Sequence, residues 1–126
     1  MALTRDQILQ ANDIEIREVY IPEWKDSVFV RGMTGKERDS YEASIVKQRG
    51  NNTEINFKNA RAKLVALCTV DEQGNRIFND TDVALLAEKS AKALDRIFTV
   101  ARELSGISAE DMNELTKNSE ETSLDD

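Results

Sequence analysis

The spacing of hydrophobic residues near the start of the chain fits first a short helix and then a β-hairpin. Thr4 and Gln7 form a capping-box pair, and the apolar residues after them predict a helix that ends by Asp13. Over residues 14–31, β-branched and aromatic residues alternate imperfectly with charged ones, and the only proline, Pro22, interrupts the run. Residues 14–31 are therefore predicted to form an antiparallel hairpin.

The rest of the chain carries hydrophobic residues at the three- and four-residue steps of helices. Thr34 with Glu37 caps a helix predicted over residues 35–48, and Thr53 caps one predicted over residues 53–68. The other predicted elements are a minor hairpin over residues 70–78, a short helix capped by Asn79 or Asp80, a longer helix that Ser90 caps and Gly106 ends, and a last short helix from Ser108 to Leu115. The predicted fold class is α+β, mainly α: an N-terminal β-hairpin followed by a small bundle of four to five helices.

The length of 126 residues is that of one domain. We predict that residues 1–117 form this single domain. Residues 118–126 contain four acidic residues, one apolar residue and no basic residue. A segment with so little apolar surface to bury is expected to form an acidic, disordered tail.

The balance of charge excludes some partners. Acidic residues outnumber basic ones 24 to 17, so the net charge is −7 and DNA is not the expected partner. No stretch approaches the ~20 apolar residues of a membrane span. The single cysteine, Cys68, excludes an internal disulfide and suits a reducing compartment, so we expect a cytoplasmic protein that uses neither nucleic acid nor membrane as partner.

The residues needed for most enzyme chemistry are missing. The sequence contains no histidine, which removes the commonest general base at neutral pH and the commonest metal ligand. Cys68 lies on the apolar face of a predicted helix and is interpreted as a core residue. The segment Gly32–Lys36 has two glycines followed by a lysine, as a phosphate loop does, but too few residues separate the two glycines. We therefore predict no catalytic residue, no metal site and no cofactor, and a protein that acts by binding another protein.

The candidate partner-binding residues lie in the loop of the predicted hairpin and are Pro22, Trp24 and Lys25. Tryptophan is a common anchor of protein interfaces. It also packs well in a core, and the sequence leaves both roles of Trp24 open.

The order of segments resembles the tail assembly chaperones of long-tailed, siphovirus-type bacteriophages, from about residue 3 to residue 118. The most specific stretches are Val19–Trp24, Val28–Asp39, Ala62–Cys68 leading into Asp71–Asn75, and Leu104–Ser108. One departure lies in the hairpin loop, where relatives often have glycine and this chain has Lys25 and Asp26.

The resemblance implies a protein that coats the tape-measure protein, keeps its apolar helical surface soluble and helps recruit the tail tube protein. It then leaves, so it is found in the host bacterial cytoplasm and not in the mature virion. This chain resembles the short form of the family. A longer form commonly arises by a minus-one ribosomal frameshift, which we hypothesise to occur at Lys117-Asn118, and its extension is thought to contact the tube protein.

Some alternatives stay open at this stage. A structural tail-completion or connector protein, which remains in the virion, would show the same patterning. The predicted helices over residues 34–48 and 53–68 could also imitate the helix-turn-helix of a small nucleic-acid-binding regulator, although acidic residues dilute their basic surface. Self-association is left undecided.

Overall fold

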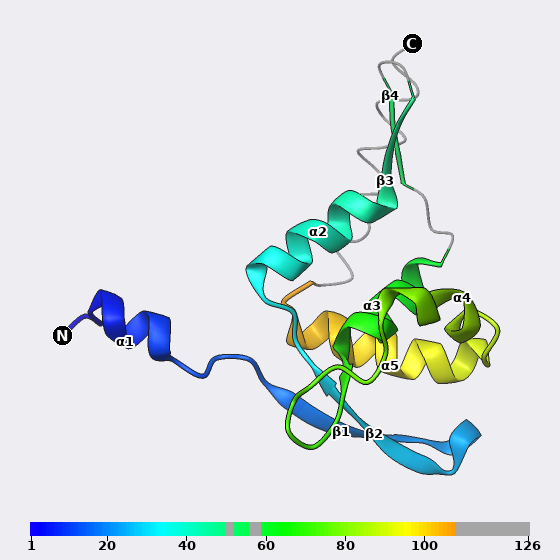
Figure 1. The fold of residues 1–126 in the computed structure, drawn as a ribbon, viewed down its shortest axis with the longest axis horizontal. Coiled ribbons are helices and arrows are strands. Elements are labelled where there is room, and N and C mark those ends of the chain that lie inside the picture. Colours follow the sequence, from blue (N-terminus) through cyan, green and yellow to red (C-terminus); the bar gives the residue numbers. More distant parts are fainter. Residues whose placement is uncertain (50–51, 56–58, 108–126) are drawn as a thin grey trace.

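The structure, a computed structural model, describes residues 1–49, 52–55 and 59–107. The helices are α1 (Arg5–Gln10), α2 (Gly35–Ile45), α3 (Ala60–Cys68), α4 (Val83–Leu86) and α5 (Ala91–Leu104). The strands are β1 (Ile16–Ile21), β2 (Asp26–Arg31), β3 (Val46–Arg49), β4 (Asn52–Ile55) and β5 (Thr69–Val70), and short 3-10 turns are η1 (Pro22–Trp24) and η2 (Asp80–Asp82). This arrangement confirms the predicted α+β, mainly helical class (Figure 1).

The predicted N-terminal hairpin is present. Strands β1 and β2 pair antiparallel, with a register that runs from Ile16 opposite Arg31 to Ile21 opposite Asp26. Strand β5 adds a third strand beside β2, giving the order β1-β2-β5. The sequence predicted an extended segment at Val70, within the minor hairpin over residues 70–78, but not its pairing with β2, because two residues that directly follow a helix are too few to show an alternation.

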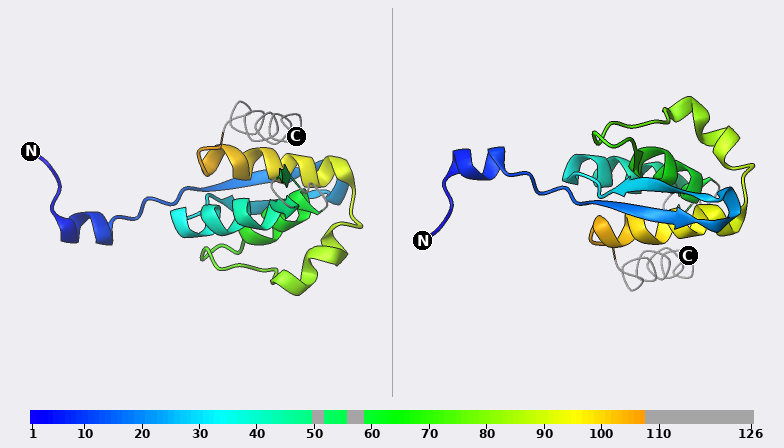
Figure 2. Two further views of the ribbon diagram at one scale, coloured as in Figure 1. Left: turned by 90° about the horizontal axis from the view of Figure 1, so that it is seen from above. Right: turned by 90° about the horizontal axis from the view of Figure 1, so that it is seen from below.

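Helices α3 and α5 lie side by side over one face of this sheet, and α2 lies beyond them (Figures 1 and 2). The fully buried side chains where these elements meet are Ile21 and Val30 from the sheet, Leu64, Val65 and Cys68 from α3, and Ile97 and Ala101 from α5. Each large aliphatic residue buried here stabilises the fold by about 1.5–3 kcal/mol. The predicted apolar stripe of α5 is thus confirmed as core.

Local hydrogen bonds set both ends of α5 as predicted. At its start, the Ser90 hydroxyl accepts a backbone N–H of the first turn. At its end, the Ile107 N–H donates to the Arg102 carbonyl (2.9 Å) and the Gly106 N–H donates to the Glu103 carbonyl (3.1 Å), which is a Schellman motif. Gly106 has a φ of 76°, a conformation that glycine adopts without strain.

The segment between α2 and α3 corrects two predicted boundaries. Helix α2 ends at Ile45, not at residue 48, because the chain continues into β3, which pairs antiparallel with β4. Thr53 therefore lies in a strand and caps no helix, and α3 begins only at Ala60. Val46 and Ile55, both β-branched, are opposite each other in the strand register. Cross-strand pairing there prevails over the helical spacing in the sequence.

This second hairpin also removes the basis of the helix-turn-helix interpretation. That interpretation needed two helices joined by a turn of three or four residues. The structure places β3 and β4 between α2 and α3 instead.

Two smaller predictions after α3 are confirmed. A turn follows Val70, which forms an isolated bridge with Arg76, and Gly74 has a φ of 85°. Asn79 then caps η2, which leads into α4. The predicted last helix from Ser108 and the predicted acidic tail lie outside the described residues.

Cys68 is a core residue, as predicted. Its side chain is fully buried, and burial raises the pKa of the thiol to about 12. Because the thiolate is the reactive form, we expect the native protein to resist alkylation by iodoacetamide at pH 8 and to react fully in 6–8 M urea. Mass spectrometry of the treated protein checks this. Equal labelling of native and unfolded samples would contradict the burial of Cys68.

Candidate functional site: a groove between α2, α3 and α4

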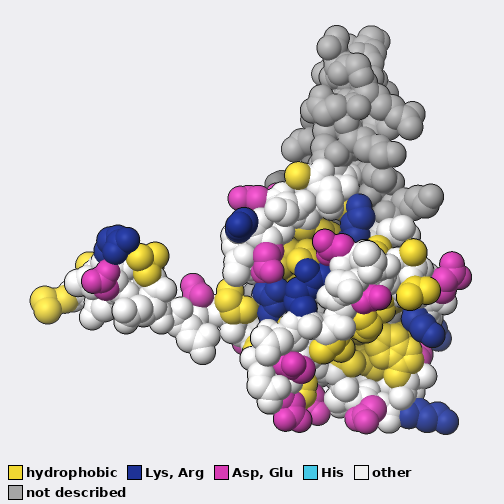
Figure 3. Space-filling view, viewed as in Figure 1, with side chains coloured by type: hydrophobic (Ala, Val, Ile, Leu, Met, Phe, Trp, Pro, Cys, Tyr) yellow, Lys and Arg dark blue, Asp and Glu magenta, His cyan; other side chains and the backbone are white. Residues whose placement is uncertain are grey.

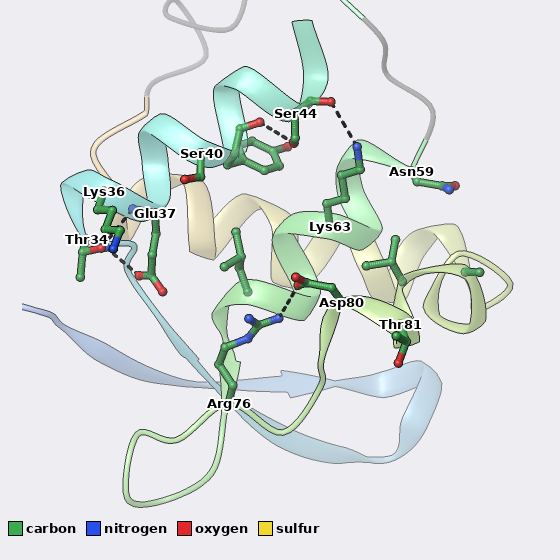
Figure 4. Close-up of a pocket in the computed structure, with 14 residues that line it drawn as sticks. Thr34, Lys36, Glu37, Ser40, Ser44, Asn59, Lys63, Arg76, Asp80 and Thr81 are labelled. Atoms are coloured by element: carbon green, nitrogen blue, oxygen red, sulfur yellow. Dashed lines mark hydrogen bonds and ion pairs between the residues drawn. The ribbon is translucent and has the colours of Figure 1, made fainter.

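A groove of about 900 Å³ lies between α2 on one side and the segment of residues 76–84 on the other, with α3 between them (Figure 4). Its lining residues are Thr34, Lys36, Glu37, Ser40, Tyr41 and Ser44 from the α2 side, Asn59, Lys63 and Leu67 from the α3 side, and Arg76, Asp80, Thr81, Val83 and Ala84 opposite. In Figure 3, hydrophobic side chains are visible below α2 and are bordered by Lys, Arg, Asp and Glu.

An ion pair fixes the end of the groove where α2 begins. The Arg31 guanidinium, at the end of β2, donates to both carboxylate oxygens of Glu37 at 2.7 Å and to the Leu67 carbonyl at 3.2 Å. Glu37 also completes the predicted capping box, because it accepts the Thr34 N–H at 3.0 Å and its own N–H donates to the Thr34 hydroxyl at 3.1 Å. This ion pair thus joins β2, α2 and the end of α3.

Further hydrogen bonds hold the two walls against α3. On the α2 side, the Tyr41 hydroxyl donates to the Ala60 carbonyl (3.0 Å) and the Lys63 ammonium donates to the Ser44 carbonyl (3.2 Å). On the opposite side, the Arg76 guanidinium donates to the Ala66 carbonyl (3.1 Å) and pairs with Asp80 (3.2 Å). The groove is therefore built by contacts among three separate segments.

The two titratable groups of the groove with shifted pKa values are both fixed in one protonation state near neutral pH. Hydrogen bonding by Arg31 lowers the pKa of Glu37 to about 2, so this carboxyl stays ionised. Desolvation by burial raises the pKa of Tyr41 to about 12, so this phenol stays protonated. Neither group is suited to exchange a proton with a substrate at pH 7.

The lining suits a polypeptide more than a small polar substrate. Tyr41, Leu67, Val83 and Ala84 supply apolar surface, and charged and hydroxyl side chains surround them. An amphipathic helix docks in such a groove through its apolar face and leaves its polar face in water. Within the described residues, no cluster of three His, Cys, Asp or Glu side chains is placed to hold a metal ion, and no helix is long and apolar enough to cross a membrane.

Similarity to a known family extends over most of the chain. A family model described as phage tail assembly chaperone matches residues 4–118. The chain belongs to the phage tail assembly chaperone family. This match confirms the resemblance found in the sequence. No curated protein and no solved structure matches this tail assembly chaperone.

The three predicted binding residues of the chaperone lie on η1 and just after it, and none of them lines the groove. Trp24 is half-buried and packs against the core, so its ring serves the fold, whereas Pro22 and Lys25 are exposed. The neighbouring Glu23 accepts two hydrogen bonds from Arg96 on α5, at 2.8 and 3.1 Å, which fixes the loop to the helix layer. A partner contact by the three residues stays a prediction.

The departure from the family pattern at Lys25 falls on a residue with a left-handed backbone conformation. Lys25 has a φ of 59°, in the left-handed region where glycine is free of strain. A relative with glycine at this position would form the same turn without that strain. The chaperone tolerates lysine because pairing of β1 with β2 on both sides of the turn defines the local backbone.

Sequence reasoning missed the groove of the chaperone. Lys36, Ser40 and Ser44 recur at four-residue steps along α2, which is a signal for one shared polar face. Thr34 and Glu37 were recognised only as a helix cap. The groove also requires α3 and residues 76–84 to lie opposite α2. Their positions depend on tertiary packing, which no short sequence pattern shows.

Proposed function

We propose that this chain is a non-enzymatic chaperone that binds the tape-measure protein, keeps it soluble and helps recruit the tail tube protein during tail assembly. It does so in the cytoplasm of the host bacterium and is absent from the mature virion. The observation that carries this proposal is the family match over residues 4–118. The groove between α2, α3 and α4 supplies a surface for the client.

The client that suits this groove is an amphipathic helix of the tape-measure protein. Its apolar stripe would lie against Leu67 and Val83, and its polar side would meet the lysines of the rim, Lys36 and Lys63. Contacts of this kind are reversible, which suits a client that is later released. The net charge of −7 supports the solubility of a loaded complex.

Co-expression tests the proposal directly. The tape-measure protein is produced with and without this chain, and its soluble fraction and copurification are measured. We expect more soluble tape-measure protein, and a stable complex of the two, when this chain is present. If the tape-measure protein is equally insoluble in both cases and does not copurify, the proposed function is wrong.

A matched pair of substitutions on α2 tests the groove. Ser40 and Ala43 are both exposed, but only Ser40 lines the groove. We expect Ser40→Tyr to fill the groove and to weaken client binding about tenfold or more, equivalent to at least ~1.4 kcal/mol. Ala43→Tyr adds the same ring outside the groove and should bind as the parent chain does. Equal affinities of the two variants, measured by titration, would exclude this groove as the client site.

The composition of purified particles tests the remaining parts of the proposal. We expect mass spectrometry of mature virions to detect no peptide of this chain, whereas a connector protein would be present. In infected cells, a longer product that begins with this sequence is expected if the frameshift occurs at Lys117-Asn118. This longer form is the one proposed to contact the tail tube protein.

A further inference from the structure

Helix α1 is folded but has no place in the core of its own domain. Ile8 and Leu9 in the helix are 56% and 66% exposed, and Leu3, just before the helix, is 67% exposed. No residue of α1 is buried. Figures 1 and 2 show α1 standing away from the rest of the fold in every view. Side chains of this kind are ordinarily buried, so a helix that presents two of them, with a third just before its cap, indicates a docking element.

The sequence specifies this helix despite its short length. The Thr4 hydroxyl accepts the Gln7 N–H at 3.3 Å, and the Gln7 side chain accepts the Thr4 N–H at 2.9 Å, so both bonds of the capping box are formed. A helix of six residues is too short to be stable in water by itself. It gains stability when its apolar side packs against a partner.

The connection to the domain determines where the helix can reach. The Gly32 N–H donates to the Glu15 carbonyl (3.1 Å), which fixes the chain at the start of β1. Between Gln10 and Glu15 the backbone spans at most about 17 Å. The arm, defined as residues 1–15, therefore carries α1 outward on a short tether, away from the helices of its own domain (Figure 2).

The groove between α2, α3 and α4 matches the arm in chemistry and size. Its apolar surface from Leu67 and Val83 suits Ile8 and Leu9, and its rim holds basic residues. The arm carries acidic residues at positions 6, 13 and 15 and one basic residue, Arg5, so its side chains have a net charge of −2. The groove is lined by three basic residues and by the acidic residues Glu37 and Asp80, a net charge of +1, so the net charges are opposite in sign. Six helical residues rise only about 9 Å, which a groove of about 900 Å³ accommodates.

We propose that the arm of one copy of this chain docks in the groove of a second copy, with α1 seated between α2 and α4. When the exchange is reciprocal, it closes a dimer in which each groove is covered. The apolar surface of both elements is then removed from water in the free protein. This inference concerns the chain without a client, so it stands or fails separately from the proposed function.

The first test compares the solution mass of three full-length proteins by light scattering across a concentration series. We expect the parent chain to reach twice the 14.2 kDa of one chain. Ile8→Asp/Leu9→Asp should require at least tenfold higher concentration to associate. The matched control, Ile77→Asp/Leu85→Asp, changes side chains that are 51% and 68% exposed outside the arm and the groove, and should behave as the parent does. A parent chain that stays monomeric, or an arm variant that associates equally well, would overturn the proposal.

The second test locates the docking site by disulfide formation between two differently tagged chains. A chain with Ile8→Cys is mixed with one carrying Ser40→Cys in the groove, while native Cys68 is fully buried and does not interfere. The heterodimeric disulfide should form at least ten times faster with Ser40→Cys than with Ala43→Cys, which lies on the same helix outside the groove. Equal rates would refute docking in the groove. In a single chain that carries both Ile8→Cys and Ser40→Cys, efficient closure at high dilution would instead show that the arm folds onto its own groove, which would also refute exchange.

Discussion

Gly32→Ala is expected to destabilise the fold by about 3 kcal/mol, a large part of the 5–15 kcal/mol that stabilises a typical domain. A Cβ atom at Gly32 would lie 2.5 Å from the carbonyl oxygen of Leu104 and 3.0 Å from its carbonyl carbon. These are backbone atoms at the end of α5, so no side-chain rotation relieves the overlap. The sheet and α5 must move apart, although they share the buried core.

The surroundings of Gly32 make such a movement costly. Its N–H is bonded to the Glu15 carbonyl, and the next N–H, of Met33, donates to the Ser105 hydroxyl at 2.9 Å. A shift of this segment would weaken both bonds, and each is worth about 1 kcal/mol.

A nearby glycine supplies the control. Gly35 begins α2, and a Cβ atom there would meet nothing within 4 Å. Gly35→Ala is therefore expected to stabilise the protein by about 0.4–1 kcal/mol, because alanine restricts the unfolded chain more than glycine does. Thermal unfolding should show a midpoint about 10 °C lower for Gly32→Ala and slightly higher for Gly35→Ala. If both variants unfold at the same temperature, the close approach at Gly32 is not a constraint.

Features determined by a few neighbouring residues could be predicted from the sequence. The caps at Thr4, Thr34 and Ser90 and the end of α5 at Gly106 all depend on hydrogen bonds within about five residues. The hairpin of β1 and β2 was also predictable, because Pro22 marks its turn and the alternation on each side marks its strands. The resemblance to tail assembly chaperones was visible for the same reason, since it rests on short contiguous stretches.

Features that depend on distant pairing were not predictable in the same way. Val46 and Ile55 fit either a helix or a strand, and the pairing of β3 with β4 decides between them. The groove joins three segments centred near Ser40, Lys63 and Thr81, and no short pattern records that they meet. For α1, the pattern identified an apolar side around Ile8 but not what that side contacts.

Replacing Glu37 with glutamine is expected to destabilise the protein by about 2–3 kcal/mol at pH 7. The Arg31 side chain is only 12% exposed, and Glu37→Gln leaves its charge without a counter-ion in that setting. The capping box largely survives, because glutamine can still accept the Thr34 N–H. The loss therefore reports the ion pair that joins β2, α2 and α3 at the end of the groove.

The effect of this substitution should depend on pH in a defined direction. Arg31 lowers the pKa of Glu37 from 4.5 to about 2 in the folded state, so the unfolded state binds a proton more readily. The stabilisation by Glu37 is then complete above about pH 4.5 and is lost as the pH falls toward 2, by about 3 kcal/mol in total. Urea denaturation at pH 7, 5, 4 and 3 should show the parent chain and Glu37→Gln converging in stability as the pH falls.

Glu23→Gln is the matched control for this pH dependence. Glu23 also accepts two hydrogen bonds from an arginine, Arg96, and they lower its pKa, but that pair lies at the surface, where water and salt weaken it. Its removal should change stability less than Glu37→Gln does and should leave most of the acid-dependent loss in place. A constant difference between the parent chain and Glu37→Gln from pH 7 to pH 3 would show that the carboxylate charge is not what joins the three elements. Convergence would instead establish Glu37 as the ionised residue on which this end of the groove depends.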